Sequence, residues 1–301
     1  MRFSTEMLGM PGRKEFGQAK IRGGARLRRG RSLVAWLLLT LHCSLVRAET
    51  PSTAFYYGGP VPVAALAHYD RVVVEAEHLA DPSVLNPGKT LVFAYVSVGE
   101  AEGWRASARS LDDSLFLGKN KPWESRIADL TQPGWVSYLI ETRMATLWRQ
   151  GYRAFFLDTL DSYQIPVKDP RAQAAQAQAL ADIIHTMHLR FPGVRLLLNR
   201  GFDVLPHIAH LADGVVAESL FRGWDPAAQR YVAVDPEGRA WLLGKLRTVQ
   251  QDYRLPVTVI DYVAPEDAEL ARATAGQIRA LGFGAWVATP GLDSLPDRPA
   301  P

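Results

Sequence analysis

Several short apolar runs in this chain end directly on a carboxylate or an amide side chain. A continuous apolar run is typical of a strand buried on both faces, and such strands occur in parallel sheets that are covered by helices. In parallel α/β folds the side chains at the carboxyl ends of the strands form the active site. The pattern therefore predicts such a fold with a polar site at one edge of its sheet. The residues that follow four of these runs are Asp158, Asn199, Glu218 and Asp261.

Eight apolar segments of this kind can be found along the chain, which is the number that a closed barrel requires. Stretches of helical periodicity or turn chemistry separate them, so the order of elements predicts right-handed parallel crossovers. We therefore expect an α/β fold with a single (β/α)8 TIM-like barrel over residues 49–293 and a flexible tail over 294–301. The expected strands are Ala54–Tyr57, Arg71–Ala76, Thr90–Val98, Ala154–Leu157, Val194–Leu198, Gly214–Ala217, Val257–Tyr262 and Gly284–Thr289, and the clearest helices are Gly134–Gln150, Asp169–Arg190, Gly238–Tyr253 and Pro265–Leu281.

The first 48 residues have the order of regions found in a secretory signal peptide. A stretch rich in arginine, lysine and glycine precedes the apolar segment Leu33–Leu41, and Val46 to Ala48 supply small residues for a signal peptidase. The basic region is long, which is compatible with a true start at an internal methionine such as Met7 or Met10. The apolar segment is short for a membrane span, so cleavage near Ala48 and secretion or periplasmic residence are expected, with an uncleaved anchor as the alternative.

The charge of the chain depends on whether this segment is counted. Residues 1–48 hold ten of the 34 basic residues and two of the 31 acidic residues, so the remainder carries 24 basic and 29 acidic residues and a formal charge of −5. The basic balance belongs to the signal segment and gives no argument for nucleic acid as a partner. The single cysteine, Cys43, lies in the same segment, so the exported protein would have neither a disulfide nor a thiolate metal site.

The stretch Arg105–Leu130 is less regular and is expected to form a long loop after the third strand. Long loops at this end of a barrel build the substrate cleft, so its aromatic residues are candidates for stacking on a ligand. For Trp123 a second interpretation stays open, in which the ring covers the barrel mouth as part of the core.

Asp158 and Glu218 are the strand-end acids that most favour chemistry. An aspartate at such a place often caps the next helix, but Asp161 can take that capping role here. Glutamate is a poor helix cap, and the apolar residues before Glu218 leave it no other obvious structural purpose. One aspartate and one glutamate that face a cleft are what glycoside hydrolysis requires.

Other polar and aromatic residues recur at or near the predicted strand ends. Each of them is weak evidence, because any strand must end on something polar, but together they predict a ring of groups suited to binding a sugar polymer. The candidate substrate-binding residues are Tyr57, Glu75, Tyr95, Ser97, Glu100, Asp161, Tyr163, Asn199, Asp261, Tyr262 and Trp286.

Several other chemistries fit the sequence poorly. No glycine-rich phosphate loop follows a strand, and no Gly-X-Ser-X-Gly elbow is present. His185 and His188 share one helix, but the glutamate of a metalloprotease helix is missing between them. We therefore expect neither a metal nor a cofactor.

Four short segments carry a further signal, and in order they are AYVSVGE at residues 94–100, FFLDTLD at 155–161, LNRG at 198–201 and VAES at 216–219. These segments resemble glycoside hydrolase family 114, the endo-α-1,4-polygalactosaminidases, whose members include hydrolase domains that act on the Pel polysaccharide. The resemblance implies a (β/α)8 barrel that cleaves α-1,4-linked galactosamine or N-acetylgalactosamine polymers with retention, with Asp158 as nucleophile and Glu218 as acid/base.

The resemblance also bears on partners. Pel hydrolases commonly continue into a carbohydrate deacetylase region, which this chain is too short to contain, so a stand-alone hydrolase and a hydrolase with a separate deacetylase or export partner both stay open. The alternative function is a catalytically silent carbohydrate-binding barrel in an exopolysaccharide export system. No stable insertion in a membrane is expected after signal cleavage.

Overall fold

The computed structural model describes residues 50–85 and 89–295 of the 301-residue chain. The predicted signal segment 1–48 and residues 296–301 of the predicted tail lie outside the described residues. The described part belongs to one compact unit that begins at Ala48. None of its helices has the length and hydropathy that a membrane crossing needs.

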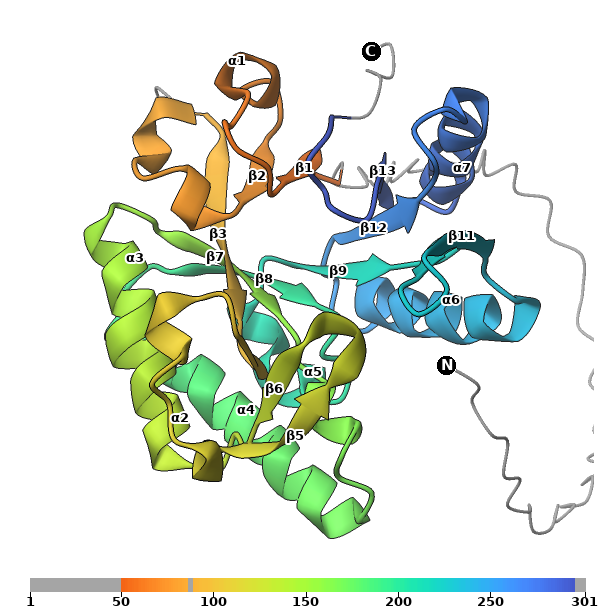
Figure 1. The fold of residues 1–301 in the computed structure, drawn as a ribbon. Helices are drawn as coiled ribbons and strands as arrows, with labels where there is room; N and C mark the ends of the chain where they lie inside the picture. Colours follow the sequence, from red (N-terminus) through yellow and green to blue (C-terminus); the bar gives the residue numbers. More distant parts are fainter. Residues whose placement is uncertain (1–49, 86–88, 296–301) are drawn as a thin grey trace, which may run out of the picture. The chain divides into compact units, whose positions relative to one another are not determined.

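Eight parallel strands form the central sheet, and they correspond to the eight apolar runs (Figure 1). Every hydrogen-bonded neighbour pair is parallel. The two outermost strands, β1 and β13, contact each other without a hydrogen-bonded ladder, so the barrel is nearly closed. The predicted (β/α)8 fold is confirmed. In sheet order the strands are β1 (Thr53–Tyr56), β2 (Arg71–Val74), β3 (Leu91–Ser97), β7 (Ala154–Asp158), β8 (Arg195–Asn199), β9 (Gly214–Glu218), β12 (Val257–Tyr262) and β13 (Gly284–Ala288).

Large aromatic side chains fill the interior of this barrel. The ring of Phe55 lies 5.6 Å from that of Phe156 and 6.3 Å from that of Trp286, and Phe156 also contacts Tyr95. Phe55, Phe156 and Trp286 are each at most 2% exposed. Because successive side chains on a strand alternate in direction, the residues two positions beyond this layer point toward the barrel mouth. The packed layer therefore forms the floor of the site.

The predicted helices are present on the outside of the barrel (Figure 1). Asp169 and Asp235 begin two of them by accepting the backbone N–H groups of Ala172 and Gly238, and a proline follows each of these aspartates at the first helical position. The long helices are α4 (Pro170–Arg190), α6 (Pro236–Gln251), α7 (Ala268–Ala280) and a continuous run of α2 (Pro133–Ser137), the π-helical η6 (Tyr138–Met144) and α3 (Ala145–Arg149).

Shorter helices that the sequence patterns did not predict lie in the connections. They are α1 (Val63–Leu66), α5 (Leu205–Ile208), η1 (Ala76–His78), η2 (Pro82–Leu85), η3 (Ala106–Ala108), η4 (Asp113–Leu115), η5 (Lys121–Trp123), η7 (Ser162–Gln164) and η8 (Ala209–Leu211).

The expectation of a long loop over Arg105–Leu130 is wrong. The segment supplies two strands of a small antiparallel sheet, in the order β4 (Glu100–Glu102), β6 (Ser125–Ala128) and β5 (Phe116–Asn120). The buried carboxylate of Glu100 accepts hydrogen bonds from Asn120, Ser125 and Ser162. Because polar contacts stabilise this sheet, its strands lack the apolar alternation by which a strand can be predicted from sequence. A hairpin of β10 (Arg222–Asp225) and β11 (Arg230–Ala233) follows β9.

Trp123 lies in η5 of this added sheet, and 62% of its surface is exposed. The interpretation that placed its ring in the core over the barrel mouth is therefore wrong. Trp104, which follows β4, is also more than half exposed.

Candidate active site

Asp158, Asn199 and Glu218 are the last residues of three neighbouring strands, and their side chains meet at the barrel mouth. The amide nitrogen Nδ2 of Asn199 donates to Asp158 Oδ1 at 2.7 Å and to Glu218 Oε1 at 2.9 Å. Because both bonds start from one atom, the two oxygens lie no farther apart than the sum of these lengths. The strand register thus brings together two carboxylates that are 60 positions apart in the sequence.

Two tyrosines, the half-buried Tyr95 and the buried Tyr262, hold the outer oxygens of the same carboxylates. The hydroxyl of Tyr95 donates to Asp158 Oδ2 at 2.9 Å, and that of Tyr262 donates to Glu218 Oε2 at 2.6 Å. Burial, and after it the nearby carboxylate charge, raises the pKa of both phenols well above the ordinary value, so they act as neutral donors. Tyr57 packs edge-on against Tyr95 with ring centroids 5.3 Å apart. The structure therefore groups six of the predicted residues around one centre.

The backbone turns sharply after each of the three strand-end residues. Thr159, Arg200 and Ser219 follow them directly and have positive φ angles of 62°, 56° and 65°. Left-handed backbone is uncommon for residues other than glycine and is unfavourable for a β-branched threonine, and such strain collects at functional sites. Each turn redirects the backbone away from the barrel axis, so the side chain of the preceding strand-end residue stays at the barrel mouth.

The turn after Asp158 is stabilised from the β3 side. Thr159 Oγ1 donates to the carbonyl oxygen of Asp158 at 2.6 Å and accepts the backbone N–H of Gly99 at 2.9 Å. The hydroxyl of Ser97 lies 2.9 Å from the same atom. A Cβ at position 99 would overlap the carbonyl oxygen of Thr159, so only glycine allows this approach.

Burial raises the pKa of Asp158, and the negative charge of Glu218 raises it further. Hydrogen bonds from Asn199, the backbone of Thr159 and Tyr95 act in the opposite direction, because they stabilise the ionised form. The pKa of Asp158 therefore depends on the charge of the carboxylate beside it. An aspartate and a glutamate held this close can act together on one bond.

The raised pKa of Asp158 predicts a pH-dependent cost in stability. The folded state of the wild type holds the Asp158 proton more tightly than the unfolded chain, so its stability falls as pH rises above about 4 and through the raised pKa. Asp158→Asn removes this titration, and its melting temperature relative to wild type should therefore increase over the same range by about 5 °C. Thermal unfolding of both proteins across the pH range tests this, and a difference that stays constant with pH contradicts it.

Glu75 lies at the end of the second barrel strand in a network of ion pairs. Both of its oxygens accept hydrogen bonds from Arg105 Nη2, at 2.6 and 2.8 Å. Arg105 also pairs with Glu102 and with Glu77, and Arg143 pairs with Glu77. The guanidinium of Arg105 is 6% exposed and lies 5.6 Å from the centre of the Tyr95 ring. Glu75 thus contacts Arg105, which in turn packs near Tyr95 at the site.

Asp261 has no exposed surface, and its oxygens hold the loop that follows Glu218. Its carboxylate accepts three backbone N–H groups, those of Leu220, Phe221 and Arg222, at 2.7 to 2.9 Å. This contact fixes the chain between Glu218 and the β10–β11 hairpin. The structure therefore places Asp261 beneath the loop instead of in the ring of groups around Asp158 and Glu218.

Asp261→Ala is expected to destabilise the fold and to lower activity. Removing the acceptor leaves three backbone donors without a partner, which costs about 4 kcal/mol in total at typical values. A lower melting temperature by about 10 °C and a reduced kcat should follow, because the loop after Glu218 loses its support. Asp225→Ala is the matched control, since Asp225 accepts two backbone N–H groups in an exposed turn. Equal effects of the two changes contradict this account.

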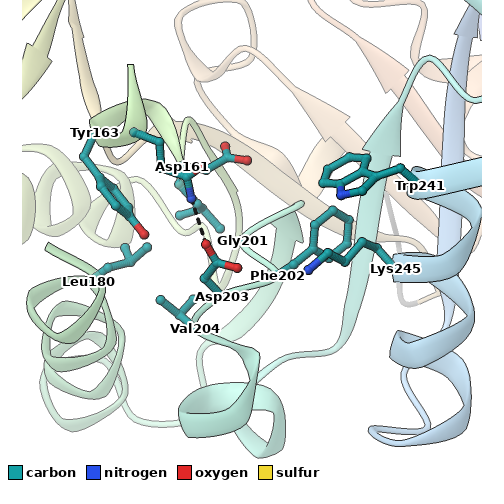
Figure 2. A pocket seen from close by; sticks show the side chains of 11 residues that line it. Asp161, Tyr163, Leu180, Gly201, Phe202, Asp203, Val204, Trp241 and Lys245 are labelled. Carbon is teal, nitrogen blue, oxygen red and sulfur yellow. Dashed lines mark hydrogen bonds between the residues drawn. The ribbon is translucent and has the colours of Figure 1, made fainter. Parts of the chain in front are cut away.

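The remaining predicted residues lie in three other places. Glu100 and Ser97 join β3 to the small antiparallel sheet, where the Ser97 hydroxyl donates to the carbonyl oxygen of Glu100. Trp286 is part of the barrel floor, and its indole Nε1 has no hydrogen-bond partner within the described residues. Asp161 and Tyr163 line a separate hollow beside the mouth (Figure 2).

Arg105 is the residue around the site that sequence reasoning did not single out. Its three carboxylate partners come from two segments, and no local spacing connects them. A lone arginine within an irregular stretch gave no usable signal. Within residues 50–85 and 89–295, no group of three or more histidine, cysteine, aspartate or glutamate side chains has an arrangement that could hold a metal ion.

A parallel eight-stranded barrel with an aspartate and a glutamate facing each other at the carboxyl ends of its strands is an arrangement that glycoside hydrolases use. The model of the glycoside hydrolase family GH114 matches residues 51–299, and this chain belongs to that family.

Solved structures agree with this assignment. The glycoside hydrolase domain of PelA from Pseudomonas aeruginosa is 39% identical with a TM-score of 0.72, and the match covers 81% of this chain and 96% of that one. Aspergillus fumigatus Ega3, solved in complex with galactosamine, shares the fold at 15% identity and a TM-score of 0.60, over 82% of this chain and 93% of that one. A comparison with curated protein sequences finds no match. The chain is thus a glycoside hydrolase, as the motifs predicted.

Proposed function

We propose that this protein is an exported retaining hydrolase that cleaves α-1,4-linked galactosamine or N-acetylgalactosamine polymers, with Asp158 as the nucleophile and Glu218 as the acid/base. The observation that carries the proposal is the Asn199 amide shared by both carboxylates. Two bonds of 2.7 and 2.9 Å from one nitrogen keep the acids close together. Retaining enzymes have carboxyl groups about 5 Å apart, whereas inverting enzymes need a wider gap for a water molecule.

In the first step an oxygen of ionised Asp158 attacks the anomeric carbon, and the bond to the leaving sugar breaks. Protonated Glu218 gives its proton to the leaving oxygen, so no free alkoxide forms. In the second step ionised Glu218 takes a proton from water, and the resulting hydroxyl displaces Asp158 from the sugar. Each step moves one proton through Glu218, and both carboxyl groups return to their starting states.

The hydrogen bonds around each carboxyl group favour this division of roles. Asp158 accepts from Tyr95, from Asn199 and from the backbone of Thr159, and three donors stabilise a carboxylate that must attack in its ionised form. Glu218 accepts from Asn199 and Tyr262. We therefore assign the attacking role to Asp158 and the proton-donating role to Glu218.

The substrate class rests on the four family motifs and on the charge of the site. Beside the site, Glu75, Glu77 and Glu102 outnumber the two arginines that pair with them, Arg105 and Arg143, and residues 49–301 carry a formal charge of −5. An acidic site favours a polymer whose free amino groups are protonated. Galactosamine bound to Ega3 is consistent with an amino sugar as the unit recognised.

Export and partners form the rest of the proposal. The sequence of residues 1–48 predicts a signal peptide with cleavage near Ala48, and an extracellular or periplasmic polysaccharide is a substrate that an exported enzyme would meet. A separate deacetylase or export protein as a partner stays a prediction from the family resemblance.

Incubation of the purified protein with galactosamine and N-acetylgalactosamine polymers, followed by mass spectrometry of the products, tests the proposal. We expect short oligosaccharides with new reducing ends, in larger yield from the substrate whose acetylation the site prefers. Affinity for oligosaccharides without any new reducing end would instead support the silent binding barrel. Products from a glucan but from neither amino-sugar polymer would contradict the substrate assignment.

A further inference from the structure

A hollow beside the barrel mouth has the composition of a sugar-binding site (Figure 2). It lies between the loop after β7, the loop after β8 and the helices α4 and α6, and it is open to solvent on one side. Tyr163 borders it on one side, and Phe202, Trp241 and Lys245 lie together on the other. None of the residues assigned to catalysis above lines it.

Two aromatic rings, the exposed Trp241 and the half-buried Phe202, form one wall of the hollow. Trp241 is 51% exposed, and its ring stands nearly perpendicular to that of Phe202 with centroids 6.1 Å apart. Single exposed apolar residues are common on protein surfaces. Apolar rings that gather in a hollow more often mark a binding site. Sugar rings have an apolar face of C–H groups that packs on such aromatic rings.

The other side chains that line the hollow include both carboxylates and a lysine. The carboxylate of Asp161 points toward the side of the hollow where the two rings lie (Figure 2), and burial raises its pKa. Asp203 accepts a hydrogen bond from Gln164 Nε2 at 2.8 Å, which leaves an exposed carboxylate with further capacity to accept. With Lys245 as a donor, the hollow offers partners for hydroxyl and amino groups alike. This mixture fits an amino sugar better than a purely apolar ligand.

The hollow is continuous along the chain with the catalytic centre. Asp161 comes three residues after Asp158, and Phe202 comes three residues after Asn199, so two adjacent strand-end loops contribute to both places. Gly201 allows the two loops to approach closely. Its φ is 65°, and a Cβ at this position would lie 2.7 Å from the Leu160 side chain. The hollow and the catalytic centre therefore share the loops after β7 and β8.

We propose that the Trp241–Phe202 hollow binds a hexosamine unit of the polymer away from the cleavage point and so makes the enzyme prefer long chains. Trp241 covers the apolar face of the sugar, Phe202 supports the Trp241 ring edge-on, and Asp161, Asp203 and Lys245 bind the polar groups of the sugar. This inference rests on the proposed function, since it names where a further unit of the same substrate binds.

Calorimetric titration of galactosamine oligosaccharides into the Asp158→Asn protein, with and without Trp241→Ala, tests the proposal. Loss of the stacking ring should weaken binding of long oligosaccharides roughly tenfold, while the shortest ligands bind unchanged. Trp241→Phe should restore most of the affinity. Leu189→Ala, which removes an 84% exposed apolar side chain from the far end of α4, is the control and should have no effect.

Kinetics of otherwise wild-type protein provide the second readout. Trp241→Ala should raise KM for long polymer and leave kcat for the shortest cleaved oligosaccharide unchanged. Asp203→Asn should weaken binding of free amino sugars more than that of acetylated ones. If Trp241→Ala matches its parent in both assays while the wild type hydrolyses the polymer, the hollow is not a subsite and the proposed function stands. A wild type that neither binds nor hydrolyses these polymers overturns both.

Discussion

Asp158→Asn is expected to reduce hydrolysis of a galactosamine polymer by roughly 10⁴-fold or more, because the glycosyl-enzyme can no longer form. Glu218→Gln should lose roughly 10² to 10⁴-fold, the usual contribution of a general acid. The two losses differ in kind. The glutamine variant retains a nucleophile and should still cleave substrates with an activated leaving group, whereas the asparagine variant should not. Initial rates of reducing-end release with polymer and with an aryl glycoside measure both effects.

The control for this pair is Asp182→Asn, which changes an exposed aspartate on α4 whose carboxylate accepts a hydrogen bond from Gln178 of the same helix. It should hydrolyse polymer at the wild-type rate. Circular dichroism and melting curves show whether each variant is folded. Substantial polymer hydrolysis by folded Asp158→Asn or Glu218→Gln would show that another group performs the chemistry.

Asn199→Ala should lower kcat by roughly 10² to 10³-fold, the range found when one preorganised donor is removed from an active site. The amide is the only group seen to bond to both Asp158 and Glu218 within the described residues. Without it, Asp158 loses a hydrogen bond that stabilises its ionised form and still faces the charge of Glu218, so the pKa of Asp158 should rise. The acid limb of the pH–rate profile should therefore move to higher pH.

A shift of the profile separates this role from simple substrate binding. Loss of a binding contact alone would raise KM and leave the profile of kcat in place. Asn199→Asp should be still less active, because a third carboxylate replaces the donor. An Asn199→Ala protein with normal kcat would contradict the role assigned to the shared amide.

The sequence predicted the barrel because its strands are buried on both faces. Such strands appear as uninterrupted apolar runs, and each run ends where the chain meets the polar mouth. Asp158, Asn199 and Glu218 were visible for this reason, since each is the first polar residue after a run. Parallel pairing then places all strand ends at one edge, and no knowledge of long-range contacts was needed.

The apolar run before Asp261 and Tyr262 could not show which of these two side chains faces the barrel mouth. Both end the strand β12, but neighbouring residues on a strand point to opposite faces. The Tyr262 hydroxyl reaches Glu218, whereas the Asp261 carboxylate holds the loop of Leu220 to Arg222. An apolar run that is buried on both faces carries no alternation from which the direction of its last residues can be read.

The added sheet after β3 was missed for a related reason. Glu100 is charged yet buried, and its partners Asn120, Ser125 and Ser162 become neighbours only when the sheet has formed. The Arg105 network is equally non-local. The periodicity of apolar residues predicts which segments form the core. It does not predict buried polar contacts between segments that are far apart in the sequence.

The configuration of the first-formed reducing end tests the central claim most directly. Proton NMR during hydrolysis of an α-1,4-linked galactosamine polymer distinguishes the two anomers before they interconvert. The spacing of Asp158 and Glu218 across the Asn199 amide predicts the α anomer first, as double displacement requires. The β anomer as the first product would show direct attack by water and contradict the account.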